Sequence, residues 1–373
     1  MKLTDVVNRI NGNVDRFTTD LEYYIGGEHF ESCELEISNK GLIKSNLNIL
    51  GFKFHFAFQE RDVIFMARNP HLRKAGMVFF SGLCSDASYI LRSKDENILT
   101  QEYLAIMLQS DHFWDYCEAH KVGSVNFAIN WKTMANYEFE LPSIEKQNEI
   151  SEKVWAAYRL KQSYKKLIAA TDEMVKSQFI EMFGNGNWEQ KALGEVGCFK
   201  RGGGFQKSDY VEHGIPCIHY GQIHTEFGPF IYSHITEISS DLESKTKFAS
   251  KGDLIIAITS EDTEGSCKST AWLGDYPVAV GGHAAIFHHC MNPVYMSFFF
   301  KSALFNYAKM EYVHGTKVCE IKPDDIAKIL VPYPPMSLQE EFSSIAKQAD
   351  KSKFELRKSI EAIDAVIKSL ING

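Results

Sequence analysis

The feature that most constrains this chain is a repeat that relates its second half to its first. At a shift of 190 to 192 residues the matching positions keep one order along the sequence. The matches are Leu3 with Leu193, Val6 with Val196, Asp62 with Asp253, Gly123 with Gly315, Pro142 with Pro334, Gln147 with Gln339, Glu149 with Glu341, Asp172 with Asp364, Lys176 with Lys368 and Ser177 with Ser369. Because a sequence repeat marks a repeated structural unit, the chain is expected to hold two domains of the same architecture.

Each copy has the same order of local patterns. Short runs rich in β-branched and aromatic residues come first, as expected of strands: Phe52–Phe58, Val63–Met66, Leu254–Ile258 and Val278–Val280. Helical stretches follow at Glu102–Tyr116 and Tyr295–Met310, and then a proline precedes a long helical pattern. The predicted fold class is therefore α+β, with two tandem domains of mixed α/β character and two long helices.

The second long helix has the clearer apolar stripe, with the alternating spacing of a coiled coil. Its stripe is Leu338, Phe342, Ile345, Ala349, Ser352, Leu356, Ser359, Ile363, Val366 and Leu370. The first helix has one stripe at Ile150, Ala157, Leu160, Tyr164, Leu167, Thr171 and Met174 and another at Val154, Lys161, Ile168, Val175 and Met182. Helices of this length reach roughly 50–60 Å, so each needs a partner. We expect an antiparallel coiled coil of the two; the alternative is that each packs on its own domain.

These patterns predict four segments. Residues 1–142 form a first domain and 143–186 a central helix that ends near 183, while 187–334 form a second domain and 335–373 a C-terminal helix.

Composition excludes several protein classes. The eight cysteines include no C-x-x-C pair and no zinc-finger spacing, so reduced thiols are expected. The first residues lack the charged and apolar regions of a signal peptide, and no run of about 18 apolar residues exists. A cytoplasmic protein without membrane contact is expected. The formal net charge of −8 argues against a protein that grips DNA strongly by itself.

The duplicated segments resemble a known family, the specificity subunits of Type I restriction-modification systems. The family carries an L-P-P-L-x-E-Q-x-x-I-like segment where each domain enters its helix, and Leu141–Ile150 and Pro334–Phe342 are similar to it. One copy has Ser143 in place of a proline, and the other has Leu338 before Gln339 where the family has an acid. Lys251–Ile255 is similar to the family's G-D-I-L-like strand, and Gly315-Thr316 to its G-T loop.

This resemblance implies two target-recognition domains that read the two halves of an interrupted, double-stranded DNA site. It also implies assembly with two modification subunits, which bind S-adenosylmethionine and methylate adenine, and with restriction subunits that use ATP and Mg. No cofactor and no catalytic residue is expected in this chain. The separation of two reading domains sets the spacing of half-sites, so the helices would act as a ruler and as the docking surface for the modification subunits.

DNA readers offer cations to phosphates, or donors and acceptors to base edges. In the first domain we expect them in the Arg68–Lys74 loop and in a second lysine cluster. In the second domain we expect them in the glycine-rich Lys200–Lys207 segment, where the backbone can approach a phosphate, and in two later stretches. The candidates are Lys40, Lys44, Arg68, Asn69, His71, Arg73, Lys74, Lys200, Arg201, Gly203, Lys207, His219, Tyr220, Gln222, His224, Ser260 and Lys268.

Two readings from other classes stay open at this point. A scaffold would use the helices to assemble other proteins and would not need basic loops. A hydrolase or nuclease would use scattered acids and histidines such as Glu261, Asp262, Glu264 and His283, although their spacing matches no known site. The sequence has no G-x-x-x-x-G-K-[ST] phosphate loop and no N-P-P-Y-like segment of an adenine methyltransferase. A metal site at Gly281-Gly282-His283 with His288, His289 and Cys290 is disfavoured by spacing.

Overall fold

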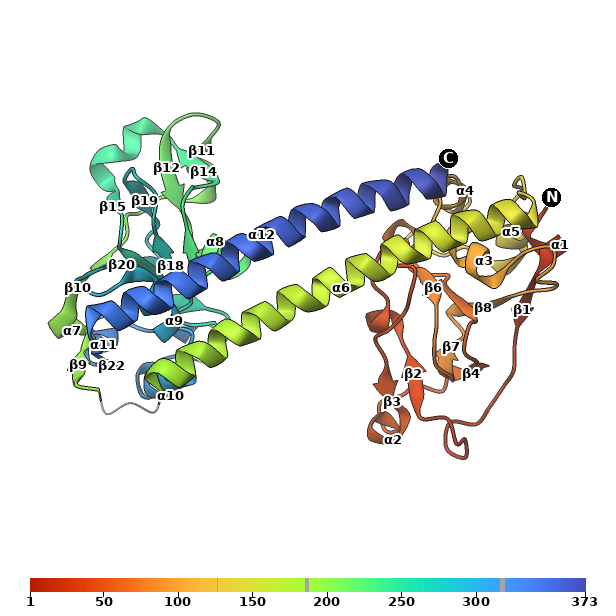
Figure 1. Ribbon diagram of the computed structural model, residues 1–373, viewed down its shortest axis with the longest axis horizontal. Coiled ribbons are helices and arrows are strands. Elements are labelled where there is room, and N and C mark those ends of the chain that lie inside the picture. The colour runs from red at the N-terminus through yellow and green to blue at the C-terminus, as the bar shows by residue number, and fades with distance from the viewer. Residues whose placement is uncertain (126, 185–187, 264, 316–318) are drawn as a thin grey trace. The chain divides into compact units, whose positions relative to one another are not determined.

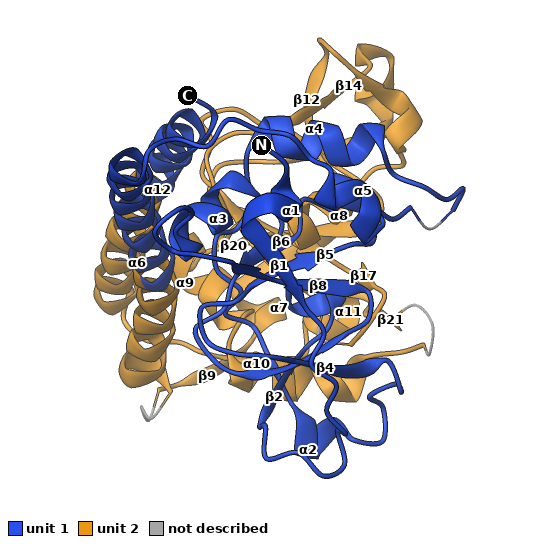
Figure 2. Cartoon of the chain, turned by 90° about the vertical axis from the view of Figure 1, so that its right-hand side faces the viewer, with its two compact units in different colours: residues 1–166, 357–373 blue, residues 167–356 orange. Residues whose placement is uncertain are grey.

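A computed structural model describes residues 1–125, 127–184, 188–263, 265–315 and 319–373. The chain divides into two compact units, which Figure 2 shows in different colours. Unit 1 comprises Met1–Lys166 and Arg357–Gly373, and unit 2 comprises Leu167–Leu356. Each unit therefore contains one globular region together with a segment of each long helix.

Unit 1 is built on two four-stranded sheets. The first has the order β1 (Val7–Ile10), β8 (Ser88–Ser93), β5 (Val63–Met66) and β6 (Ala75–Met77), with antiparallel neighbours throughout. The second has the order β3 (Gly41–Leu42), β2 (Tyr23–Ile25), β7 (Gly82–Ser85) and β4 (Phe54–Phe58), and its β2–β7 pair is parallel. Strand β5 is buried along its whole length, as its run of apolar residues predicts.

Short helices complete unit 1. They are α1 (Leu3–Val6), α2 (Ile43–Asn46), α3 (Gln101–Met107), α4 (Asp111–Ala119) and α5 (Trp131–Ala135), with 3₁₀ turns η1 (Gly27–His29) and η2 (Pro70–Leu72). The predicted helical stretch Glu102–Tyr116 consists of two helices, because Ser110 closes the last turn of one and caps the next. Its hydroxyl donates to Met107 O and accepts from Phe113 N–H.

Unit 2 repeats this plan with additional strands. One sheet has the order β10 (Gly197–Arg201), β20 (Ala284–His289), β16 (Leu254–Ala257), β18 (Ser269–Trp272) and β13 (Phe230–Ile231). The other has the order β11 (Tyr210–Val211), β14 (Thr236–Ile238), β12 (Ile215–Ile218), β19 (Val278–Val280) and β15 (Lys247–Ala249). Two small pairs join β17 (Thr259–Ser260) to β21 (Cys319–Glu320) and β22 (Leu330–Pro332) to β9 (Gln190–Ala192).

The helices of unit 2 also follow those of unit 1. They are α7 (Leu193–Val196), α8 (Tyr220–Thr225), α9 (Pro293–Phe299), α10 (Ala303–Lys309) and α11 (Pro323–Ile326), with 3₁₀ turns η3 (Lys207–Asp209), η4 (Ser240–Lys245) and η5 (Met310–Tyr312). Here too the predicted helix Tyr295–Met310 is split by a serine cap. The Ser302 hydroxyl donates to Phe299 O and accepts from Phe305 N–H.

The topology confirms the repeat predicted from sequence. The order β1-β8-β5-β6 corresponds to β10-β20-β16-β18, and the parallel pair β2–β7 of unit 1 corresponds to β12–β19. Ser110 and Ser302, which cap equivalent helices, are themselves 192 residues apart. The fold is therefore mixed α and β in two tandem domains, as predicted.

The two long helices are α6 (Ile144–Phe183) and α12 (Met336–Asn372) (Figure 1). In unit 1 the early residues Val154 and Tyr158 of α6 share a core with the late residue Ile367 of α12. In unit 2 the late residue Phe179 of α6 lies against the early residue Phe342 of α12, with ring centroids 5.2 Å apart. The segments are therefore antiparallel within each unit, and they pack both on each other and on the globular region.

The predicted main stripe of α6 is wrong in part. Leu160, Leu167 and Met174 are 45%, 50% and 50% exposed, whereas Val154 and Val175 of the second stripe are 0% and 3% exposed. In α12, Val366 is 53% exposed and its neighbour Ile367 is buried. The helices turn their buried faces toward the globular cores as well as toward each other, so a strict two-helix spacing does not describe them.

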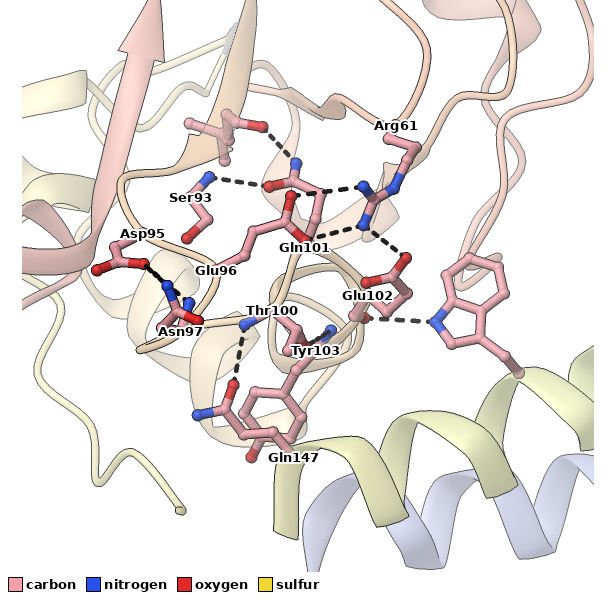
Figure 3. A network of polar contacts seen from close by, with 12 residues as sticks. Arg61, Ser93, Asp95, Glu96, Asn97, Thr100, Gln101, Glu102, Tyr103 and Gln147 are labelled. Atoms are coloured by element: carbon pink, nitrogen blue, oxygen red, sulfur yellow. Dashed lines mark hydrogen bonds and ion pairs between the residues drawn. The ribbon is translucent and has the colours of Figure 1, made fainter. Parts of the chain in front are cut away.

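The start of α6 is fixed to unit 1 by a polar network (Figure 3). The Arg61 guanidinium lies 2.9 Å from Glu96 Oε2 and 2.8 Å from Glu102 Oε1, which links the turn between β4 and β5 to the start of α3. The Gln147 side chain of α6 accepts a hydrogen bond of 3.0 Å from the backbone N–H of Thr100.

Among the residues that the structure describes, none of the helices combines the length and the apolar character that a membrane span requires.

Candidate nucleic-acid interface

The Arg68–Lys74 loop of unit 1 joins β5 to β6 and contains the turn η2. Asn69 and Arg73 flank the turn with φ of 52° and 48°, a left-handed conformation that asparagine tolerates better than arginine does. Pro70 between them is buried, and Asn69 N–H donates to Phe127 O at 2.8 Å. The loop therefore has a defined conformation, because hydrogen bonds hold its backbone at Asn69 and Arg73.

The side chains of this loop divide into two groups. The Arg73 guanidinium pairs with Asp111 of α4, and the Lys74 ammonium donates to Gly27 O at 2.8 Å. Arg68 and His71 are exposed. Two of the predicted DNA-binding cations, Arg73 and Lys74, therefore hold the loop to the rest of unit 1. Arg68 and His71 remain exposed to solvent, next to the half-buried Asn69.

The second predicted cluster of unit 1 belongs to the other sheet. Lys40 precedes β3, and its ammonium lies 3.7 Å from the ring centroid of Tyr23 and 4.4 Å from that of Phe80. Lys44 is exposed on α2. Lys40 and Lys44 lie on either side of β3, whereas the Arg68–Lys74 loop joins β5 to β6, so the two sequence clusters of unit 1 lie on different sheets.

In unit 2 the predicted residues of three segments converge. Strand β10 ends in Lys200 and Arg201, both exposed, and the Arg201 guanidinium donates to Gly282 O at 2.9 Å and lies 3.4 Å from Glu320 Oε1. Gly203 is buried, and a Cβ atom at this position would lie only 2.7 Å from the backbone oxygen of Lys245. The glycine-rich segment therefore begins at the end of strand β10 and passes close to the backbone of Lys245, while the cations Lys200 and Arg201 remain exposed.

Helix α8 brings an aromatic group to the same region. The Tyr220 ring lies 4.5 Å from the His219 ring, 6.1 Å from the His224 ring and 5.2 Å from the His283 ring, measured between centroids. His224 Nε2 is 3.2 Å from Thr259 O at β17, which connects α8 to the end of β16. The polar-aromatic stretch predicted from sequence therefore surrounds one tyrosine, together with a histidine that sequence reasoning had not counted among the readers.

The His219 imidazole is held in its neutral form. Partial burial lowers its pKa, and the positive charge of Lys207 and the neighbouring His283 lower it further. Its Nδ1 accepts a hydrogen bond of 3.2 Å from Gly221 N–H. With Nδ1 engaged as an acceptor, the neutral ring keeps its Nε2–H as a hydrogen-bond donor.

Gln222 supports this cluster from inside the unit. The side chain is 9% exposed, its Oε1 accepts from His219 N–H at 2.8 Å, and its Nε2 donates to Thr236 Oγ1 at 2.9 Å. The sequence placed Gln222 among the residues that contact DNA, but its amide is used within unit 2. It positions His219 at the start of α8.

The loop that follows β16 in unit 2 corresponds to the Arg68–Lys74 loop of unit 1. Met66 N–H donates to Lys74 O at 2.9 Å, and Ala257 N–H donates to Lys268 O at 2.8 Å. The residue before each lysine is left-handed: Arg73 has φ 48° and Cys267 has φ 62°. Ser260 at the start of this second loop is half-buried and Lys268 at its end is exposed. Both repeats thus place predicted readers at the same position of the fold.

Among the acids of the hydrolase reading, Asp262 has a structural role in the part of the chain that the structure describes. Asp262 accepts a hydrogen bond from Gly265 N–H and so shapes the turn after β17. Glu264 lies outside the described residues, as does Thr316 of the predicted G-T loop. Among the residues that the structure describes, no three His, Cys, Asp or Glu side chains are grouped so that they could hold a metal ion.

Two neighbours of the cluster, His283 and Glu320, were not predicted as part of it. His283 follows Gly281 and Gly282 in the turn between β19 and β20, and Glu320 lies on β21. The duplication is the signal that could have found Glu320, because the repeat relates Glu320 to Ala128 and Thr259 to Arg68. Ala128 forms a backbone bridge with the predicted reader Arg68, and Glu320 pairs with Thr259 in the same way.

Fold and site together define a class: a tandem-repeat protein with two equivalent loop-bearing α+β domains and two shared helices. A family model, the Type I restriction modification DNA specificity domain, matches residues 1–169 and 185–364. The chain belongs to this family, and its function is DNA sequence recognition. The comparison with curated proteins finds no match.

Solved structures support the fold. A chain from a study of complex assembly and conformational transition of the type I R-M system superposes with a TM-score of 0.58 at 16% identity, covering 100% of this chain and 95% of that chain. The S subunit of a Type I restriction-modification system from M. genitalium gives a TM-score of 0.57 at 12% identity, covering 100% of this chain and 94% of that chain. Both have the fold described above.

Proposed function

We propose that each unit reads one half of a bipartite, interrupted site in double-stranded DNA and that the two long helices set the unread gap between the halves. The observation that carries this proposal is the equivalence of the β5–β6 loop in unit 1 and the β16–β18 loop in unit 2. A protein with a repeated reading loop suits a site with two halves, because half-site spacing follows from the separation of the reading domains.

The exposed residues of these surfaces divide by chemistry. Arg68 in unit 1, and Lys200 and Lys207 in unit 2, are cations for phosphates or guanines. The exposed His71 and His283 and the half-buried Tyr220 offer polar and aromatic contacts to base edges. The net charge of −8 supports a further element of the proposal, namely that partner subunits supply much of the phosphate contact.

The chain would act without catalysis of its own. Two modification subunits would dock on the helices, bind S-adenosylmethionine and methylate adenine, and restriction subunits would add cleavage driven by ATP and Mg. The complex would work in the cytoplasm, where the DNA is. This assignment of roles follows from the family and from the two-domain architecture, in which the reading loops and the helices have separate tasks.

The test is a genome-wide map of adenine methylation in host cells with and without this gene, with the partner genes held constant. We expect a two-part motif with one fixed gap that disappears on deletion. If the motif stays methylated without this chain, the recognition role is wrong and a scaffold role replaces it.

Loop variants then assign the halves. Replacing Arg68 and His71 together by alanine should relax one half of the motif, and replacing Lys200 and Lys207 should weaken binding through the other unit. Lys251→Ala, at an exposed position before β16 and outside both the reading loops and the long helices, is the control and should leave the motif unchanged. A relaxation of both halves by either loop variant would contradict the assignment of one half to each unit.

A further inference from the structure

Two ion pairs, one inside each unit, join helices α6 and α12. In unit 1, Lys161 Nζ lies 2.7 Å from Asp364 Oδ1, and in unit 2, Lys353 Nζ lies 2.6 Å from Asp172 Oδ1. At the repeat shift of 192 residues Lys161 aligns with Lys353, and Asp172 aligns with Asp364. Each pair therefore joins the lysine of one repeat to the aspartate of the other, so the two pairs are equivalent under the repeat.

The lysines are the buried partners. The side chains of Lys161 and Lys353 are each 10% exposed, whereas those of Asp364 and Asp172 are 47% and 45% exposed. Lys161 Nζ also lies 3.1 Å from Glu34 Oε1, and Lys353 Nζ lies 3.8 Å from Asp350 Oδ1. A buried ammonium is tolerated only where an acid meets it.

Apolar contacts alone would specify the register of these helices less strictly. Around the lysines the helix faces carry Val154, Tyr158, Val175, Ala349 and Ile367, and such surfaces tolerate repacking. A single polar residue in an otherwise apolar helix seam can specify the register at some cost in stability. Sliding one helix by a heptad moves each aspartate by about 10.5 Å along the axis, beyond the reach of its lysine.

We infer that Lys161–Asp364 and Lys353–Asp172 select one register of α6 against α12 and thereby determine the gap of the DNA site. This inference rests on the proposed function of the helices as a ruler. A slip of one heptad, about 10.5 Å, corresponds to about three base pairs at 3.4 Å per base pair. The two lysines are then positioning residues for specificity, although they need not touch DNA.

The experiment measures methyl transfer by the full chain assembled with its modification subunits. The substrates are duplexes that carry both halves of the mapped motif and differ only in the gap. The variant is Lys161→Met with Lys353→Met, which keeps the aliphatic stems and leaves Asp364 and Asp172 in contact with water. The control is Lys132→Met with Lys251→Met, which removes one exposed cation from each unit outside the long helices.

We expect the unaltered chain and the control to methylate duplexes of one gap. The lysine variant should gain methylation at gaps that differ by about three base pairs, the distance of a heptad slip. A folded lysine variant that methylates only the native gap overturns the inference. Failure of the proposed function looks different, because the unaltered chain would then show no preference for any gap.

A second variant keeps the test decisive if the lysine variant does not fold. Asp172→Ala with Asp364→Ala removes the same two ion pairs at half-exposed positions and leaves no side-chain acceptor there, while Glu34 and Asp350 still face the lysines. Circular dichroism and the thermal unfolding midpoint establish that each variant is folded. The same additional gaps should appear, and a folded alanine variant restricted to the native gap overturns the inference equally.

Discussion

Gln147 and Gln339 make the same hydrogen bonds at the starts of the two long helices. Gln147 Oε1 accepts from Thr100 N–H at 3.0 Å, and Gln339 Oε1 accepts from Asn292 N–H at 2.9 Å. Their amide nitrogens donate to Pro142 O at 2.9 Å and to Pro334 O at 2.8 Å. Thr100 and Asn292 are the N-caps of α3 and α9. The glutamine of the duplicated segment is thus a structural link between domain and helix.

Replacing either glutamine by alanine should destabilise the chain. Gln147 and Gln339 are 0% and 1% exposed, so the backbone groups that they bind would lose their partners without gaining water. A buried group left without a partner costs about 1–3 kcal/mol. Urea unfolding of Gln147→Ala should show this loss, and Asn148→Ala at the exposed neighbouring position should change stability by less than about 0.5 kcal/mol. Equal stability of the two variants would contradict the structural role.

The duplication made the fold predictable from one sequence. A repeat fixes the number of domains, their equivalence and the presence of two long helices, and the strands Val63–Met66 and Val278–Val280 were predicted with their observed bounds. The serine caps at Ser110 and Ser302 were missed because helical periodicity continues across a cap. The register of two strands separated by many residues is a tertiary property, so the sheet order could not be read from local patterns.

The candidate site was predictable only as a set of polar loops. Composition cannot show that Arg73 and Lys74 bind Asp111 and Gly27 O, because those partners are distant in sequence. The apolar stripe of α6 was misjudged for a related reason. Leu160 and Val154 both recur at heptad positions, and only the placement of the globular core decides which one is buried.

Phe342→Ala should remove the central contact between the long helices in unit 2. The Phe342 ring lies 5.2 Å from Phe179, 5.8 Å from Phe183 and 5.1 Å from Phe298 between centroids, and it is 0% exposed. Truncating a buried phenylalanine costs about 3–5 kcal/mol, because a cavity remains. The thermal unfolding midpoint measures the loss. Val366→Ala, 53% exposed on the same helix, is the control and should have little effect.

His289 should make stability fall in mild acid. Burial lowers the pKa of this imidazole from 6.5 to about 4, so the folded state favours the neutral ring. The unfolded chain binds a proton below pH 6.5, so the stabilisation is complete above that pH and is lost as the pH falls toward 4. Between pH 7 and 5 the loss is about 2 kcal/mol.

The check compares urea unfolding of the unaltered chain and His289→Phe at pH 7 and 5. Phenylalanine keeps a ring beside Phe287 but cannot be protonated, so the variant should lose less stability over this interval. His213→Gln, at an exposed position, should retain the full pH dependence. A variant with the same pH dependence as the unaltered chain would show that other groups cause it.

Lys200 and Lys207 should contribute to DNA binding through charge. Both are exposed in unit 2, and the nearby Arg201 is already engaged by Glu320. Each phosphate contact that is removed lowers the slope of log affinity against log salt by about 1. For the chain assembled with its modification subunits, Lys200→Ala with Lys207→Ala should therefore lower this slope by about 2. Lys251→Ala, an exposed lysine before β16, should leave it unchanged, and an unaltered slope in the double variant would remove both lysines from the interface.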